Sequence, residues 1–307
     1  MRCLIVGLLS CLLLAGHLAA RADEGFFSTA PRLNPDVERN YYWKPVASFL
    51  LPSFDQWVER QWGPAAVYAG VATTGVGVAA NAAPAIDQDA YRHKDLEDYD
   101  DAERRYAYGL QLYTFAGELS AFHSFRTAVK TRQSDGQFSF LRKDETSGDL
   151  LLAPFDFSQL SHPTTYAPLL ALTVVGVVDL SQGHKRRAFN ASDAAFTGGV
   201  SYNAGVGEEA FFRGYLMPVL REGTGSDLAA NVITAVIFGL GHISSSNPYP
   251  VFQGLFGFYL GALTQGDDWS LRQAVFLHAW WDVLAIGFSV AGRKEGYVPL
   301  PGIVMQF

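Results

Sequence analysis

The chain has 307 residues, of which 49% are hydrophobic and only 17% are charged. A disordered chain is excluded, because disorder requires low hydrophobicity and high charge. The excess of 30 acidic over 23 basic residues excludes an electrostatic nucleic-acid binder, which needs a basic surface to neutralise phosphates. Two cysteines, Cys3 and Cys11, are too few for a disulfide scaffold. A globular protein or a multi-pass membrane protein remains.

The beginning of the chain has the form of a secretory signal peptide. Arg2 supplies a short positive start, residues 4–18 are largely apolar, and Ala20-Arg21-Ala22 matches the cleavage pattern. The alternative is an uncleaved membrane anchor, although the apolar run is short for a span of roughly 20 residues. We therefore predict a cleaved signal peptide at residues 1–22.

The remainder predicts an all-α fold, a multi-pass transmembrane helical bundle with about six to seven spans of apolar sequence. The expected spans are residues 64–84, 106–126, 165–180, 194–218, 228–247, 251–266 and 271–291. A basic cluster at residues 184–187 follows the third span and indicates a cytoplasmic end.

This pattern predicts two parts after the signal peptide. Residues 23–160 form an N-terminal region with one or two membrane helices and polar loops, and residues 161–307 form a core of closely spaced apolar segments. The lipid bilayer is then one partner of the chain. Together with the signal peptide, the spans favour a multi-pass protein of the bacterial inner membrane.

Ionisable residues stand inside three of the apolar segments of the core. They are Glu208, Glu209 and Arg213 in the first, His242, which follows Phe238 by four residues, in the second, and His278 with Asp282 in the third. Alone, each group has an ordinary explanation, such as a solvated helix face or a core histidine. Charged groups at membrane depth are expensive and mark function by default, so the three groups together predict a site.

Helical spacing organises these residues further. Residues four apart share one face of a helix, so Glu209 can pair with Arg213 and His278 lies beside Asp282. Glu208 then points away from the ion pair. A carboxylate in a low-dielectric site suits a general base, and a histidine can share the proton of a water or stabilise an oxyanion. The same groups could instead hold a metal that activates the water.

The three motifs resemble those of a known family. Glu-Glu-x-x-x-Arg, Phe-x-x-x-His and His-x-x-x-Asp, in this order over about residues 160–291, are similar to the CAAX-protease and bacteriocin-processing (CPBP, or ABI) family of intramembrane endopeptidases. That family includes the type II CAAX prenyl endopeptidases. The resemblance implies a helical membrane core with a site buried between helices.

The resemblance also implies roles for the site residues. Glu208 is the general base, His242 helps to activate the attacking water, and Glu209 and Arg213 support the helix together with Phe238 of the second motif. His278 and Asp282 orient the substrate carbonyl or its oxyanion.

Asp282 stands where some members of the family have Asn. An ionised Asp cannot donate to an oxyanion, which favours a metal site of Glu208, His242, His278 and Asp282 holding Zn²⁺ or another divalent ion. A metal-free mechanism remains open.

Two other functions are weighed against this one. A rhomboid-type serine protease is not supported, because Ser201 lies in Gly-Val-Ser-Tyr rather than in Gly-x-Ser-Gly. A catalytically silent membrane immunity or scaffold protein would keep the same helical core without turnover. We expect a peptide or membrane-protein substrate, because prenylated CAAX substrates are not expected for a bacterial envelope protein.

Overall fold

The computed structural model describes residues 40–91, 94, 98–133, 136–141, 143–181, 189–244 and 249–292. No strand occurs within these ranges, and every regular element there is a helix. The prediction of an all-α fold is therefore confirmed. The predicted signal peptide at residues 1–22 and the basic cluster at residues 184–187 lie outside the described residues.

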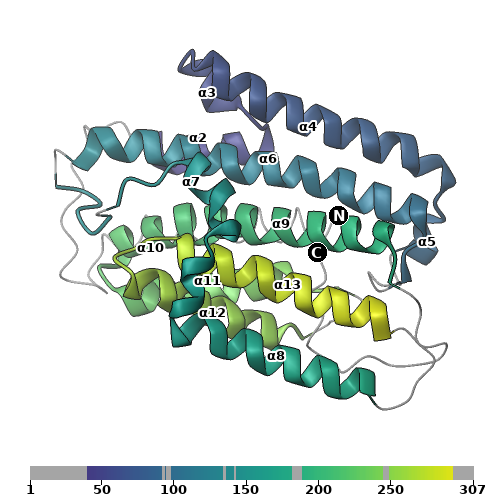
Figure 1. The fold of residues 1–307 in the computed structure, drawn as a ribbon. Helices are drawn as coiled ribbons and strands as arrows, with labels where there is room; N and C mark the ends of the chain where they lie inside the picture. The colour runs from purple at the N-terminus through teal and green to yellow at the C-terminus, as the bar shows by residue number, and fades with distance from the viewer. Residues whose placement is uncertain are drawn as a thin grey trace.

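Five long helices lie side by side in the order α4, α6, α9, α13 and α8 (Figure 1). Their bounds are Trp62–Ala82, Asp101–Arg132, Ala191–Phe211, Arg272–Gly292 and Pro163–Ser181. α9 thus lies between α6 and α13, in the middle of this row.

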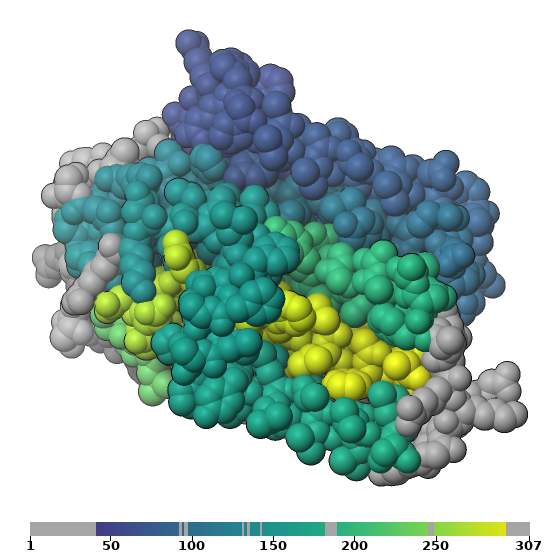
Figure 2. Space-filling view, viewed as in Figure 1, coloured from purple at the N-terminus to yellow at the C-terminus, as the bar shows by residue number. Residues whose placement is uncertain are grey.

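Shorter helices complete the described part of the fold. They are α2 (Asn40–Leu50), α3 (Phe54–Val58), η2 (Ala83–Ala85), α5 (Gln88–Tyr91), α7 (Ser147–Leu152), η5 (Ala153–Phe155), η6 (Phe157–Ser161), η7 (Phe212–Leu216), α10 (Met217–Thr224), α11 (Asp227–Gly241) and α12 (Val251–Gly266). α11 and α12 pack against each other, and α12 also contacts α13. The α7–η6 segment passes across α13, which is otherwise seen at the surface between α9 and α8 (Figure 2).

The N-terminal ends of α6 and α9 are joined by hydrogen bonds of the Asp193 carboxylate. Asn190 caps α9 in a capping box, because its side chain accepts from the backbone of Asp193 while the Asp193 carboxylate accepts from the backbone of Asn190. The same carboxylate accepts from the buried Arg104 of α6, with Nη1 and Oδ1 2.8 Å apart. One acidic side chain therefore caps α9 and joins it to α6.

The α9–α13 contact depends on a residue without a side chain. A Cβ atom at Gly205 of α9 would lie only 2.6 Å from the backbone nitrogen and Cα of Ala279 on α13. The two backbones therefore approach closely, as is usual where small residues line helix interfaces in membranes. This approach brings the acidic motif of α9 next to the histidine motif of α13.

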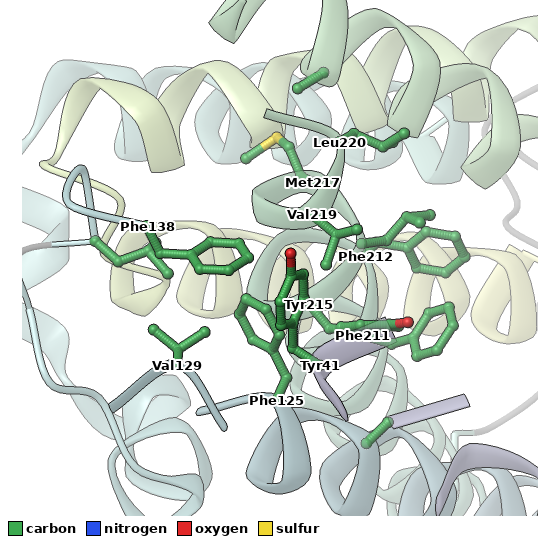
Figure 3. Packing of buried hydrophobic residues seen from close by; sticks show 14 of the residues in the cluster. Tyr41, Phe125, Val129, Phe138, Phe211, Phe212, Tyr215, Met217, Val219 and Leu220 are labelled. Atoms are coloured by element: carbon green, nitrogen blue, oxygen red, sulfur yellow. The ribbon is translucent and has the colours of Figure 1, made fainter. Parts of the chain in front are cut away.

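The N-terminal helices are part of the same core. Tyr41 of α2 packs with Phe125 of α6 and with Phe211 and Tyr215, which follow the acidic motif (Figure 3). The Tyr215 hydroxyl also donates to the backbone carbonyl of Tyr42. The helices before residue 160 thus support the site directly, and the division into parts at 23–160 and 161–307 stays a prediction.

Three helices among the described residues are long and apolar enough to cross a membrane: Trp62–Ala85, Pro163–Ser181 and Arg272–Gly292. They match three of the seven expected spans. Only 22% of the most apolar window of α8 is buried, so most of its apolar side chains face outward.

The other four expected spans are also helical, but they differ from single spanning helices. α6 is 32 residues long and its ends are charged, and the helix of residues 194–218 changes type at Phe212. α11 and α12 have 15 and 16 residues, which is short for a span of roughly 20. The number of six to seven spans therefore stays a prediction.

Candidate active site

The four predicted catalytic residues lie together, on α9, just after α11 and on α13. The Glu208 Oε2 atom is 3.9 Å from His242 Nε2 and 3.9 Å from His278 Nε2. His278 Nε2 is also 3.5 Å from Asp282 Oδ2. The side chain of Glu208 is 15% exposed, whereas those of His278 and Asp282 are fully buried. The Glu208 carboxylate thus faces both imidazoles from the most accessible position in the group.

His242 is oriented by the helix that it terminates. It follows Gly241 at the end of α11, and its Nδ1 lies 2.7 Å from the carbonyl oxygen of Phe238. Because a carbonyl only accepts, Nδ1 carries the proton of this hydrogen bond. Nε2 is therefore the nitrogen directed at Glu208, as a histidine that takes part in water activation requires.

The ring of Phe238 packs against both histidines of the site. Its ring centre is 4.5 Å from that of His242 and 6.0 Å from that of His278. The guanidinium of Arg213 lies over the same ring, 4.5 Å from its centre. This cation–π contact is favourable in a desolvated position, so the aromatic residue of the second motif contacts all three motifs.

Glu209 and Arg213 form the expected i,i+4 ion pair, with Nη1 and Oε1 2.8 Å apart and both side chains fully buried. Arg213 also donates through Nη2 to the carbonyl of Gly257 on α12, at 2.7 Å. On the other side, His278 Nδ1 lies 2.7 Å from the same Oε1 atom of Glu209. The Glu209 carboxylate thus joins α9 to α13 directly and to α12 through Arg213, which sequence spacing alone could not predict.

The helix changes type directly after the two acidic residues. Residues 212–216 form a π-helix, where a regular α-helix was expected. Gly214 within this turn packs against Phe122 of α6, and a Cβ there would lie 2.5 Å from the ring. Single π-turns inside α-helices are frequent at functional sites.

Several buried polar atoms of the site make no hydrogen bond to any described residue. They are Glu208 Oε2, His278 Nε2, and Oδ1 and Oδ2 of Asp282. Buried polar groups in native proteins are normally satisfied by protein or water. These atoms are therefore available to hydrogen-bond with a water molecule or a substrate.

The predicted metal ligands were Glu208, His242, His278 and Asp282. Among the described residues, no three His, Cys, Asp or Glu side chains are grouped so that they could hold a metal ion. As placed, the residues do not fit a metal centre, and the metal-ligand set stays a prediction.

Sequence reasoning did not include Glu118 of α6 in the site. This residue is 9% exposed, and its Oε2 would be only 2.2 Å from a Cβ atom at Gly207, the neighbour of Glu208. The signal was present in the sequence, since Glu118 is an acid inside the apolar segment 106–126. The rule that singled out Glu208 applies to it equally.

An apolar groove of about 630 Å³ lies beside the site, between α8 and α12. Phe256 of α12 and Trp281 of α13 line it, with ring centres 5.0 Å apart. The Phe256 ring centre is 5.6 Å from that of His278. One aromatic ring thus separates the groove from a predicted catalytic imidazole.

A family model described as type II CAAX prenyl endopeptidase Rce1-like matches residues 190–284. This segment of the chain is similar to the Rce1-like family. The match begins at the residue that caps α9 and includes all three motifs, so the resemblance seen in the sequence is confirmed. No curated protein and no solved structure matches the chain. The family match and the three long apolar helices favour a membrane protein, and the description of the matched family favours a peptidase.

Proposed function

We propose that the protein is an intramembrane endopeptidase in which Glu208 activates a water molecule for attack on a peptide bond. The observation that carries this proposal is the pair of 3.9 Å separations between Glu208 Oε2 and the Nε2 atoms of His242 and His278. These distances are too long for direct hydrogen bonds. They fit a water molecule held between the three groups.

In this mechanism, Glu208 takes a proton from the water as its oxygen attacks the scissile carbonyl carbon. His242 accepts a hydrogen bond from the same water through Nε2 and so fixes its orientation. Glu208 then passes the proton to the leaving nitrogen, which completes hydrolysis. General-base catalysis of this kind contributes about 10²- to 10⁴-fold.

His278 is the group best placed to stabilise the oxyanion. As an imidazolium, it would donate through Nδ1 to Glu209 and present an Nε2–H toward the reacting carbonyl. Asp282, 3.5 Å from this Nε2, balances the positive charge. Asp282 then supports catalysis without donating a hydrogen bond itself. An ionised aspartate, which has no proton to give, can therefore stand at this position.

The expected substrate is a peptide or a membrane protein. The groove between α8 and α12 supports this proposal, because its lining is apolar and it lies one ring away from His278. Such a groove suits an apolar segment that approaches through the bilayer of the inner membrane. No step of this mechanism passes through a metal, and metal assistance by Zn²⁺ stays a separate hypothesis.

The experiment compares wild type with Glu208→Gln, both purified in detergent. Each is incubated with a quenched-fluorescence peptide library and with a prenylated CAAX peptide, and the products are identified by mass spectrometry. We expect cleavage by the wild type and a loss of at least about 10²-fold in the variant, with the same melting temperature. Full cleavage by the variant would refute the role of Glu208. No cleavage of either substrate by the wild type would favour the catalytically silent immunity or scaffold protein.

A further inference from the structure

The segment that joins α2 to α4 buries polar side chains and exposes apolar ones. We call this segment, residues 43–62, the elbow. Its buried polar residues are at most 4% exposed, and they are Ser48, Ser53, Asp55 and Gln56. Its outward residues are 44–60% exposed, and they are Trp43, Leu50, Leu51, Trp57, Val58 and Trp62. Water favours the opposite arrangement, since apolar burial stabilises a fold and polar burial opposes it.

The buried polar groups of the elbow are hydrogen-bonded to α6. Ser124 donates to Asp55 through its hydroxyl, at 2.7 Å. The Ser120 hydroxyl donates to Gln56 Oε1 at 2.7 Å, and Gln56 Nε2 donates to the Ser120 carbonyl at 3.0 Å. The backbone N–H of Ser53 donates to the Ser120 hydroxyl at 2.9 Å. Partners inside the protein compensate the burial of these groups, so the elbow is held in place with its apolar side outward.

The exposed side of the elbow combines indole rings with charges. The rings of Trp57 and Trp62 pack edge to face with their centres 5.3 Å apart. Between them in the chain, Glu59 and Arg60 are both exposed. Charged groups are expensive in the hydrocarbon of a bilayer, whereas tryptophan prefers the boundary between hydrocarbon and water. This combination therefore fits the headgroup layer better than either bulk water or the bilayer centre.

The elbow stands at one end of a helix that can span a membrane. α4 begins at Trp62, and its 21 residues rise by about 31 Å at 1.5 Å per residue. The hydrocarbon core of a bilayer is about 30 Å thick. Val67 and Val76 of α4 are 61% and 53% exposed, so the outward side of this helix is apolar as well. Trp62 thus lies where such a helix would leave the hydrocarbon.

We infer that the elbow is an interfacial membrane anchor, in which Trp43, Trp57 and Trp62 lie in the headgroup layer at one surface of the bilayer. The partner of this surface is lipid, because the apolar side of the elbow continues the outward apolar side of α4. Figure 2 shows α3 and the start of α4, in purple, projecting beyond the neighbouring helices, as an anchor requires. The inference concerns placement in the membrane and does not depend on peptidase activity.

The anchor is connected to the helix that carries the acidic motif. The ring centre of Phe49 at the end of α2 is 4.7 Å from that of Phe211 at the end of α9. Tyr215 donates to the backbone carbonyl of Tyr42. A Cβ at Gly117 of α6 would lie 2.4 Å from the Phe49 carbonyl oxygen, so α2 and α6 also approach closely. The depth of the elbow in the bilayer therefore sets the depth of the candidate site.

The first test measures how lipids quench the tryptophan fluorescence of the full chain in phosphatidylcholine vesicles. The lipids carry bromine either just below the headgroup or at the chain ends. Wild type is compared with the triple variant Trp43→Phe/Trp57→Phe/Trp62→Phe. The matched control is Trp269→Phe, whose ring is 7% exposed and packs against Phe140. Shallow bromine should quench the wild type more than deep bromine does; the triple variant should lose most of this shallow quenching, and the control should keep it.

Three results would contradict the inference. If iodide in the water quenches the fluorescence that the triple variant lacks, and bromine does not, the elbow faces water. If deep bromine quenches it more than shallow bromine, the elbow lies in the hydrocarbon. If no quencher reaches it, the elbow is covered by protein, such as a second copy of the chain.

A spin label gives a second measurement that leaves the tryptophans in place. The label is attached to Leu51→Cys in a chain whose Cys3 and Cys11 are replaced by serine. Oxygen, which is concentrated in lipid, should relax this label more than a water-soluble nickel complex does. A label at Asp101→Cys, on the exposed and charged start of α6, should show the reverse order. The same order at both positions would overturn the anchor, whether or not a substrate has been found.

Discussion

The buried ion pair of Glu209 and Arg213 gives the sharpest prediction about stability. Arg213→Met keeps most of the apolar volume but leaves the Glu209 carboxylate buried without its arginine partner. Breaking a fully buried pair in this way costs about 3–5 kcal/mol. The carbonyl of Gly257 also loses its donor, so we expect a fall of about 4–5 kcal/mol in the free energy of unfolding.

For a chain of this size, 1 kcal/mol corresponds to roughly 2–4 °C in melting temperature. The melting temperature of Arg213→Met in detergent should therefore fall by roughly 10 °C or more, measured by tryptophan fluorescence at neutral pH. The double variant Glu209→Gln/Arg213→Met should recover part of this loss, because it removes a buried carboxylate that has lost its arginine and keeps only its contact with His278.

The matched control is Arg272→Met, which removes an exposed ion pair. Arg272 Nη2 is 3.0 Å from Asp149 Oδ1, and the two side chains are 49% and 33% exposed. Exposed pairs contribute about 0–1 kcal/mol, so the melting temperature should fall by no more than roughly 4 °C. If Arg213→Met and Arg272→Met have equal effects, the assignment of a stabilising buried pair is refuted.

Three further predictions concern packing, pH and metal. Gly205→Ala should destabilise the fold by about 1–3 kcal/mol, because its Cβ meets the backbone of Ala279, whereas Gly198→Ala on the same helix has open space and should be neutral or stabilising in thermal melts. Burial raises the pKa of Glu145 above its ordinary value of 4.5, although Ser270 and the Leu271 amide donate to it. The ionised form is therefore disfavoured in the fold, and the melting temperature should fall as pH rises from 4.5 through the raised pKa. Glu145→Gln should remove this part of the slope; an identical slope would contradict the assignment. Finally, a chelator should leave the rate of peptide cleavage unchanged, since no three potential ligands are grouped among the described residues; inhibition that added Zn²⁺ reverses would show a metallopeptidase.

The local parts of the site could be predicted from the sequence. The pairs Glu209–Arg213 and His278–Asp282 are four residues apart, and helical geometry alone places each pair together. The proximity of His242 to Glu208 was expected from the family resemblance. In the structure, His242 Nε2 and Glu208 Oε2 are 3.9 Å apart.

The remaining parts depend on tertiary contacts that local spacing does not encode. The hydrogen bond from His278 to Glu209 needs the close approach of α9 and α13 at Gly205. The π-turn depends on packing against α6, since Gly214 meets the Phe122 ring there. Glu118 lies far from the motifs in sequence, and only the packing of α6 on α9 brings it to the site.

The helix lengths show a second limit of sequence reasoning. Apolar runs at residues 228–247 and 251–266 predicted spans, whereas the helices there have 15 and 16 residues. Hydropathy measures how apolar a segment is, but not whether it crosses the bilayer or is buried among other helices. α12 illustrates this, because Phe256 and Leu260 on one face are buried against neighbouring helices.

The central claim is that Glu208 is the general base of a peptidase. The most direct measurement is the single-turnover rate of peptide cleavage by the wild type and by Glu208→Gln, on the same substrate and in the same lipid vesicles. The account predicts a rate ratio of at least about 10², with equal melting temperatures, because the amide cannot accept the proton of the attacking water. A ratio near one for two equally folded proteins would contradict it.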